Sequence, residues 1–315
     1  MHEIKSMINP TIDVELMNNK RKRRPPGGPP VQKNNLVKID SFFFQNELKV
    51  SELVKKISYH RIWFEVIQKH TPLKIKELDD HTQYRHDISY EERETYFLCE
   101  YPTIRRFGLL DFLSNLPSEK LAAFHLFDSF SLLLNSIDLL SRNGLTFFCI
   151  APQDIVIGEH LRPVLRNFEN CYFLDQATQF IANHKESEYK PIECRVVCYL
   201  TKNKCASLSI ANIEEICDGY SSEYVDYLRK FINKPASTIV QELLSSAGSW
   251  SKYSLALVYL HLIHELSNDF SLKYKFMDEF INLLHQISDP NPYRLSDTQE
   301  ILTRLHGIND FTSFS

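Results

Sequence analysis

The stretch that decides the fold is Gly144-Leu-Thr-Phe-Phe-Cys-Ile-Ala-Pro-Gln-Asp-Ile-Val-Ile-Gly158. Two short runs of β-forming residues, 145–148 and 155–157, bracket the loop at its centre. An apolar run with helical spacing, 121–140, precedes it, and Pro163-Val-Leu-Arg-Asn-Phe-Glu169 follows shortly after. This order predicts a long helix that leads into a buried loop, and then a second loop with polar residues.

Composition sets the broad class of the protein. The chain has 315 residues, of which 43% are hydrophobic and 24% are charged, as is ordinary for a globular protein with one large domain or two lobes. The net charge of -4 gives no reason to expect nucleic-acid binding by the chain as a whole. Polar residues interrupt 121–140, and the first residues are too polar for a signal peptide, so neither a membrane span nor secretion is expected.

No metal site is predicted. The seven cysteines contain no C-x-x-C pair, which favours free thiols in a reducing intracellular compartment. Cys194 and Cys198 lie one helical turn apart, and His261 and His264 lie on an apolar helical run. Packing on one helix face is the simpler interpretation of both pairs, because neither has a further ligand nearby in the sequence.

Residues 1–35 are predicted to form a disordered basic arm rich in Pro and Gly. A run of five cations precedes Pro25-Pro-Gly-Gly-Pro-Pro30, which cannot form a helix or a central strand. Three interpretations stay open: a contact with a polyanion, a nuclear import signal, or a solvated linker. The cations are Lys20, Arg21, Lys22, Arg23 and Arg24.

Two compositional regions follow the arm. Residues 36–102 mix short strands with one helix, and the segment 103–315 is dominated by helices. Strands are expected at 36–39, 63–67, 73–75 and 95–100, with a helix over 42–57. Beyond residue 102, helices are expected at 109–115, 118–142, 192–200, 213–216, 224–232, 239–244, 253–266, 276–287 and 298–305.

The central stretch resembles the catalytic loop of the protein-kinase superfamily. An active kinase has the pattern H-R-D-[IL]-K-x-x-N, followed by D-F-G. Here Phe147-Phe-Cys-Ile-Ala-Pro-Gln-Asp154 runs in the same register, and Asn167-Phe-Glu169 lies where D-F-G would be. Downstream, Trp250-Ser-Lys-Tyr253 is similar to the start of the helix that centres the kinase large lobe, and Pro292-Tyr-Arg294 is similar to the closing segment around its arginine.

The resemblance implies an α+β, protein-kinase-like bilobal fold. It implies a reduced β-containing N-lobe at 36–102 and a large helical C-lobe at 103–315. The compact first lobe and the long helical tail are most similar to the divergent kinase-like proteins of large DNA viruses. A viral protein of this kind would lie in the host cytoplasm or the virion, or in the nucleus if the basic arm directs import.

The polar groups that the resemblance would make catalytic are mostly replaced. Cys149 stands for the aspartate that accepts the hydroxyl proton, and Ala151 stands for the lysine that steadies the transferred phosphoryl group. The remaining degenerate positions are Asp154, Asn167, Phe168 and Glu169. These groups act as a unit in catalysis, so the loss of several together predicts that no residue of this set is catalytic.

Nucleotide binding is expected to be weak or absent. The resemblance aligns Lys38 and Glu47 with the lysine that pairs with nucleotide phosphates and with its helix partner. No G-x-G-x-x-G precedes Lys38, so backbone N–H groups cannot close over phosphates. Lys38 and Glu47 are thus either a vestigial cofactor-binding pair or an ordinary surface lysine and helix glutamate, and no cofactor is assigned beyond weak ATP with magnesium.

Two further positions follow from the resemblance. Ser251 stands where an aspartate normally holds the backbone of the catalytic loop, which predicts that this tether is lost. Arg294 normally pairs with a glutamate at the end of the activation segment, and Glu193 is the candidate partner. About 57 residues separate Glu193 from Ser251, which is far more than in a typical kinase.

The sequence therefore favours a catalytically inactive kinase homologue, a pseudokinase, that serves as a protein-interaction or regulatory module. Its partner would be a protein that the sequence does not identify. The alternative is a divergent serine/threonine protein kinase that uses Asp154 and an unrecognised base. A third hypothesis is a polyanion binder that acts through the basic arm.

Overall fold

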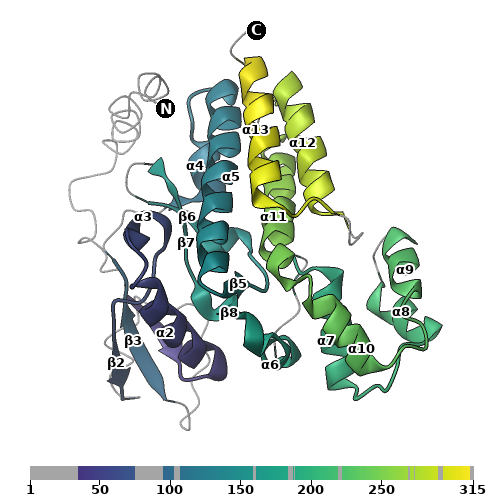
Figure 1. Ribbon diagram of the computed structural model, residues 1–315. Coiled ribbons are helices and arrows are strands. Elements are labelled where there is room, and N and C mark those ends of the chain that lie inside the picture. Colours follow the sequence, from purple (N-terminus) through teal and green to yellow (C-terminus); the bar gives the residue numbers. More distant parts are fainter. Residues whose placement is uncertain are drawn as a thin grey trace.

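The computed structural model shows two lobes (Figure 1). It describes residues 35–74, 95–102, 107–158, 161–183, 187, 189–218, 222–268, 270–272, 274–289 and 294–312. A small lobe with a β-sheet comes first in the chain, and a large, mainly helical lobe follows it. The predicted bilobal α+β fold is thereby confirmed. The basic block at 20–24 lies outside the described residues.

The first lobe is built on an antiparallel sheet with the order β1-β3-β2. Its strands are β1 (Asn35–Ile39), β2 (Lys69–Leu73) and β3 (Tyr96–Glu100). Helix α2 (Phe42–Val54) begins after Ser41, whose hydroxyl accepts the N–H of Phe44 and so caps the helix. Phe44 is buried against Ile67 and Cys99, which fixes the face that α2 turns toward the sheet.

The strand predicted over 63–67 is wrong. Trp63 ends a short helix, α3 (His60–Trp63), and the chain beyond it makes only an isolated parallel bridge, between Phe64 and Leu165, rather than a strand over 63–67. The N–H of Glu65 donates to the carbonyl of Leu165 in the second lobe at 2.8 Å, whereas the N–H of Gln68 donates to Glu100 in the first. This segment is buried because it crosses between the lobes. Its apolar pattern therefore resembles that of a buried strand.

The second lobe is a helical assembly around α5 and α11 (Figure 1). Ser118 caps α5, as predicted, and aromatic side chains at helical spacing join the long helices: the ring centroids of Phe130 and Tyr259 lie 4.9 Å apart. Among the described helices, none has the length and apolar character needed to cross a membrane. The sequence analysis predicted no helix at 177–183, where the structure has α6. The helices are α4 (Leu109–Ser114), α5 (Glu119–Arg142), α6 (Ala177–Asn183), α7 (Ile192–Lys202), α8 (Ile210–Ile216), α9 (Ser222–Arg229), α10 (Ala236–Leu244), α11 (Trp250–Leu266), α12 (Lys275–Ile287) and α13 (Thr298–Thr312).

Short strands fix the position of the central loop, residues 148–154. The two runs that bracket this loop, β5 (Leu145–Phe147) and β6 (Ile155–Ile157), do not pair with each other. Strand β5 pairs with β8 (Cys171–Phe173), whereas β6 lies between β4 (Phe107–Gly108) and β7 (Pro163–Leu165). The loop is therefore fixed at both of its ends, and the turn at 167–170 is carried between β7 and β8.

Tyr259→Phe tests the packing of α5 against α11. The buried hydroxyl of Tyr259 donates to Ser129 Oγ at 2.7 Å, and Ser129 in turn donates to the carbonyl of Leu126. We expect the variant to lose about 1 kcal/mol of unfolding free energy, because one buried hydrogen bond is removed without opening a cavity. Urea denaturation measures this loss, and Tyr274→Phe provides a control outside this helix pair. A change below about 0.3 kcal/mol would contradict the assigned role of the bond.

Candidate functional site

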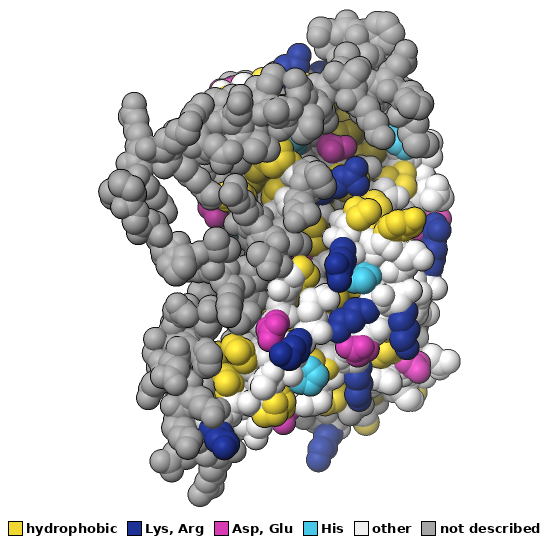
Figure 2. Space-filling model, turned by 90° about the vertical axis from the view of Figure 1, so that its left-hand side faces the viewer, with side chains coloured by type: hydrophobic (Ala, Val, Ile, Leu, Met, Phe, Trp, Pro, Cys, Tyr) yellow, Lys and Arg dark blue, Asp and Glu magenta, His cyan; other side chains and the backbone are white. Residues whose placement is uncertain are grey.

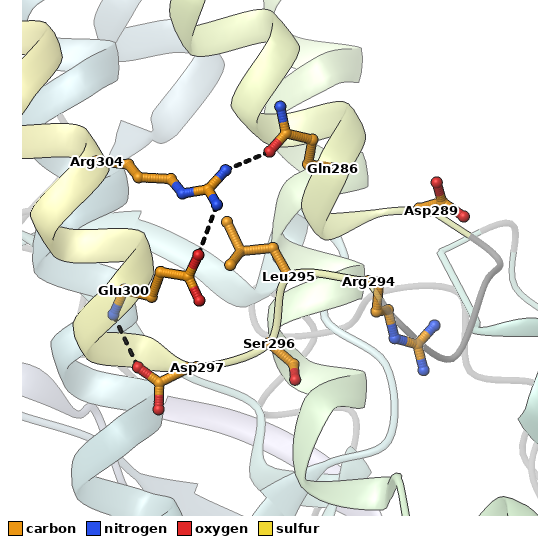
Figure 3. Close-up of a pocket in the computed structure, with 8 residues that line it drawn as sticks. All are labelled: Gln286, Asp289, Arg294, Leu295, Ser296, Asp297, Glu300 and Arg304. Atoms are coloured by element: carbon orange, nitrogen blue, oxygen red, sulfur yellow. Dashed lines mark hydrogen bonds and ion pairs between the residues drawn. The ribbon is translucent and has the colours of Figure 1, made fainter.

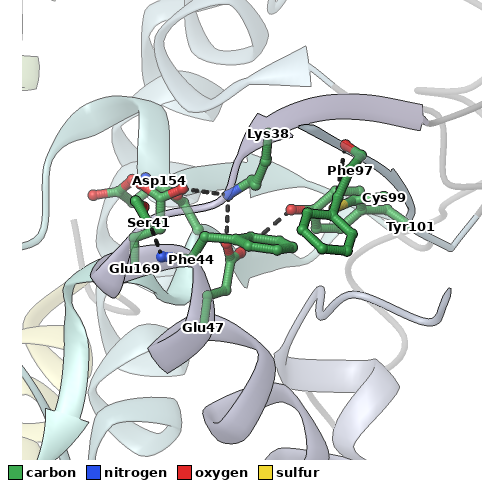
Figure 4. A network of polar contacts seen from close by, with 10 residues as sticks. Lys38, Ser41, Phe44, Glu47, Phe97, Cys99, Tyr101, Asp154 and Glu169 are labelled. Atoms are coloured by element: carbon green, nitrogen blue, oxygen red, sulfur yellow. Dashed lines mark hydrogen bonds and ion pairs between the residues drawn. The ribbon is translucent and has the colours of Figure 1, made fainter. Parts of the chain in front are cut away.

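Lys38 is the centre of a charged network between the two lobes (Figure 4). Its ammonium forms an ion pair with Glu47 of α2 and a second ion pair with Glu169 at 2.7 Å. Strand β1 supplies the lysine, α2 supplies the first carboxylate, and the 3₁₀ turn at 168–170 in the second lobe supplies the other. The structure thus brings Lys38 and Glu47 together and adds Glu169 as a second carboxylate.

The network is mostly shielded from solvent. The side chains of Lys38 and Glu47 are 12% and 1% exposed, whereas that of Glu169 is 35% exposed. Tyr101 donates its hydroxyl to Glu47 Oε1 at 3.3 Å. Burial alone would lower the pKa of Lys38, but Glu47, Tyr101 and Glu169 together raise it above its usual value. Lys38 is therefore protonated at neutral pH.

Asp154 lies in a buried turn beside this network. One of its oxygens accepts the N–H of Ala151 at 2.9 Å, and the other accepts Nδ2 of Asn167, also at 2.9 Å. Asn167 has φ 59°, in the left-handed region that asparagine tolerates better than most residues. Burial raises the pKa of Asp154 from 3.8 to about 6, and the hydrogen bonds from Asn167 and Ala151 and the charge of Arg166 only partly oppose this effect.

Apolar packing holds the positions that carry polar side chains in an active kinase loop. The buried rings of Phe147 and Phe168 lie 5.3 Å apart, and Phe64 of the first lobe meets Phe168 at 5.9 Å. Phe148 lies edge-on to Trp250 at 6.3 Å. The thiol of Cys149 is also buried and lies 3.2 Å from the hydroxyl of Ser187. The predicted buried loop thus lies in an apolar environment.

The predicted loss of the loop tether at Ser251 is wrong. Ser251 Oγ accepts the N–H of Phe147 at 3.0 Å and lies 3.1 Å from the carbonyl of the same residue. It also lies 2.9 Å from the hydroxyl of Thr146. A buried hydroxyl on α11 is therefore close enough to bind the loop backbone directly, so a shorter side chain takes over the role expected of a carboxylate.

Glu193 and Arg294 form a buried ion pair at 2.5 Å. Arg294 also donates Nε to Ser249 Oγ at 3.2 Å, and its guanidinium lies 5.2 Å from the centre of the Tyr253 ring. The pair joins the start of α7 to the segment that precedes α13. Since both side chains are almost fully buried, removing either one would leave an uncompensated charge in the interior.

Two contacts of the site were not anticipated from the sequence. Asn46 donates Nδ2 to the carbonyl of Cys171 at 2.6 Å, which ties α2 to β8, and Tyr101 binds Glu47. An asparagine in the middle of a helix gives only a weak signal, because such residues commonly face solvent. Tyr101 precedes Pro102 and so indicates the end of a strand rather than a binding role.

The residues present do not fit a magnesium-bound nucleotide. Lys38 is already neutralised by carboxylates on two sides, and Asp154 uses both of its oxygens within the turn. Asn167 is uncharged, and Glu169 places a carboxylate beside the ammonium of Lys38, where it would repel an anion. In the described part of the chain, no cluster of three or more His, Cys, Asp or Glu side chains could hold a metal ion.

A shallow cavity of about 360 Å³ lies elsewhere, between α12 and α13 (Figure 3). Arg304 reaches across it to Gln286 and Glu300, and Asp297 accepts the N–H of Glu300 at 2.8 Å. These polar groups bind one another. The cavity shares no residue with the network around Lys38, so it is not part of the candidate site.

Asp154→Asn removes the titrating group and can keep both hydrogen bonds, because the amide of Asn167 can turn over and accept one. The folded protein holds the Asp154 proton more tightly than the unfolded chain, so stability falls as pH rises from 3.8 to about 6. We expect the variant to gain about 3 kcal/mol relative to the wild type across that window. Urea denaturation over a pH series measures the gain. Asp175→Asn is the exposed control, and parallel curves for wild type and Asp154→Asn would contradict the prediction.

No protein-family model matches the chain, and no curated protein matches it. The kinase domain of Mycobacterium tuberculosis PknI is similar over 90% of this chain and 88% of that chain, with 12% identity and a TM-score of 0.46. A second structure of that domain is similar over 91% and 88%, with 11% identity and a TM-score of 0.44. A rhoptry antigen kinase domain of Toxoplasma gondii is similar over 88% and 74%, with 12% identity and a TM-score of 0.46. Solved kinase domains are thus among the structures to which this chain is similar.

Proposed function

We propose that the chain is a catalytically inactive kinase homologue that serves as a protein-interaction or regulatory module. The ion pair between Lys38 and Glu169 carries this proposal. In an active kinase, the corresponding lysine pairs with the phosphates of the nucleotide. Here a carboxylate of the chain itself, Glu169, pairs with the lysine, and an incoming phosphate would have to displace it. The pair of Lys38 with Glu47 is one that active kinases also require, so that pair does not by itself oppose phosphate binding.

The central loop supports the same conclusion. Phosphoryl transfer depends on positioned charges and on a group that accepts the proton of the attacking hydroxyl. The buried thiol of Cys149 and the methyl of Ala151 supply neither of these functions. Asp154 is the one carboxylate of the loop, and its hydrogen bonds to Ala151 and Asn167 give it a structural role.

Buried polar contacts that hold the second lobe together are nevertheless present. Ser251 binds the loop backbone, and Arg294 pairs with Glu193. A chain that keeps these buried polar contacts while its phosphate-handling groups are replaced is suited to present a rigid surface to another protein. The partner is expected to be a protein, and contact of a polyanion with Lys20–Arg24 stays a separate prediction because the arm lies outside the described residues.

Glu169→Ala tests the blocking role of the carboxylate. Its removal leaves Lys38 with one partner, and we expect affinity for inorganic tripolyphosphate to rise about fivefold to tenfold at low ionic strength. The wild-type chain should bind the same anion weakly or not at all. Isothermal titration calorimetry with the full chain measures both affinities.

Asp226→Ala is the control for this titration. It removes a carboxylate from an exposed ion pair with Arg229 at 3.4 Å, in the second lobe. This control should change tripolyphosphate affinity by less than about twofold, because both side chains of the pair lie on the surface. Equal affinities in wild type and Glu169→Ala would show that the carboxylate does not block the site.

A divergent serine/threonine kinase is the second candidate, since the ion pair of Lys38 with Glu47 is kept. Incubation with labelled ATP and magnesium separates the two functions. We expect no incorporation of phosphate into the chain. Incorporation that disappears in Asp154→Ala would favour the kinase and overturn the inactive assignment.

A further inference from the structure

The side of the first lobe formed by α2, α3, β2 and β3 carries an excess of positive charge. Figure 2 shows Lys and Arg side chains spread over its described part, with hydrophobic side chains between them and few acidic ones. In the segment 49–62, Lys49, Lys56 and Arg61 are exposed, and none of the three forms an ion pair with a described residue. We call this surface the α2–α3 face, defined by residues 49–62.

Two large apolar side chains lie in the middle of this face. Tyr59 is 80% exposed and Ile62 is 41% exposed. They are two of the five large hydrophobic side chains that are exposed in the described chain. The N–H of Ile62 donates to the carbonyl of Tyr59 at 2.9 Å, so both side chains belong to one tight turn. An exposed aromatic ring beside arginine and lysine is typical of the energetically dominant part of a protein interface.

Tyr59 has a backbone conformation that a tyrosine rarely adopts. Its φ is 58°, in the left-handed region, which costs a residue with a bulky side chain about 1 kcal/mol relative to glycine. The fold does not use the ring, because it is exposed. Strain at a position that the core does not need suggests that the side chain serves another purpose.

Backbone hydrogen bonds and the buried side chain of Phe64 fix the position of this turn. The N–H of Phe64 donates to the carbonyl of His60 at 2.8 Å, and Phe64 itself is buried against Phe168 of the second lobe. Glu65 continues the connection through its N–H to Leu165. A surface fixed in this way loses little conformational entropy when a partner binds.

From this charge and shape we infer that the α2–α3 face docks an acidic protein segment with an apolar residue among its carboxylates. Glu52 and Glu100 also lie on this side, paired with Lys55 and Lys69, so the basic track is interrupted. A phosphate backbone needs a more continuous row of cations, and the interruption therefore favours a protein over a nucleic acid. This inference rests on the proposed role as an interaction module and names the chemistry of its partner.

The test uses the full chain and a short labelled peptide of Asp and Glu residues around a central Leu-Phe pair. We expect binding that weakens as salt is raised and that falls about tenfold in the double variant Lys56→Glu, Arg61→Glu. The matched control is Lys202→Glu, Lys204→Glu, which reverses two exposed cations at the end of α7. It should change the affinity by less than about twofold. Fluorescence anisotropy measures each affinity.

Tyr59→Gly separates docking from folding. Glycine relieves the left-handed conformation, so the melting temperature should stay equal or rise, while peptide affinity falls about fivefold with loss of the ring. Equal peptide affinity in the wild type and both α2–α3 variants would overturn the docking surface. So would binding of a single-stranded oligonucleotide or of phosphatidylserine vesicles that is tighter than peptide binding and is lost in the double variant Lys56→Glu, Arg61→Glu. Phosphate incorporation from ATP would instead overturn the proposed function and leave the surface intact.

Discussion

The charge of Lys38 is the constraint on which the rest of the site depends. A protonated lysine that is only 12% exposed must be neutralised, and its two carboxylates come from different lobes. Glu47 is more deeply buried than Lys38 and forms the inner half of the network, together with the hydroxyl of Tyr101. Glu169 reaches Lys38 from the turn that follows Asn167. The ion pairs therefore close the space between the lobes as well as satisfying the lysine.

The ion pair between Lys38 and Glu169 contributes little free energy. Glu169 is 35% exposed, and a pair with that much solvent contributes only about 1 kcal/mol. Such a contribution changes an anion affinity severalfold, which could not by itself exclude a nucleotide with several phosphates. The other replacements must therefore add to it. Asn167 carries no charge for a metal, and Asp154 has both oxygens engaged within its own turn.

The sequence was informative where burial alone decides the structure. Apolar periodicity located α5 and α11, and the cap at Ser118 was evident from residue type and position. It failed at 63–67 because a segment buried between two lobes has the same apolar composition as a strand. Ser251 shows a different limit. A serine in place of an aspartate indicates a lost contact only if the helix and the loop backbone stay equally far apart. Here α11 approaches Phe147 closely enough for the serine hydroxyl to reach its N–H.

The contact that Glu169 makes could not be predicted from the sequence. From the sequence alone Glu169 was only one of the replaced positions of the loop, whereas the structure places its carboxylate 2.7 Å from the ammonium of Lys38. The same turn places Phe168 against Phe147 and Phe64, so the residue between Asn167 and Glu169 anchors the turn in the core. Apolar packing thus sets the direction of the carboxylate. The buried ring of Phe168 therefore positions Glu169 to neutralise Lys38, and this coupling joins the apolar core of the second lobe to the charged network between the lobes.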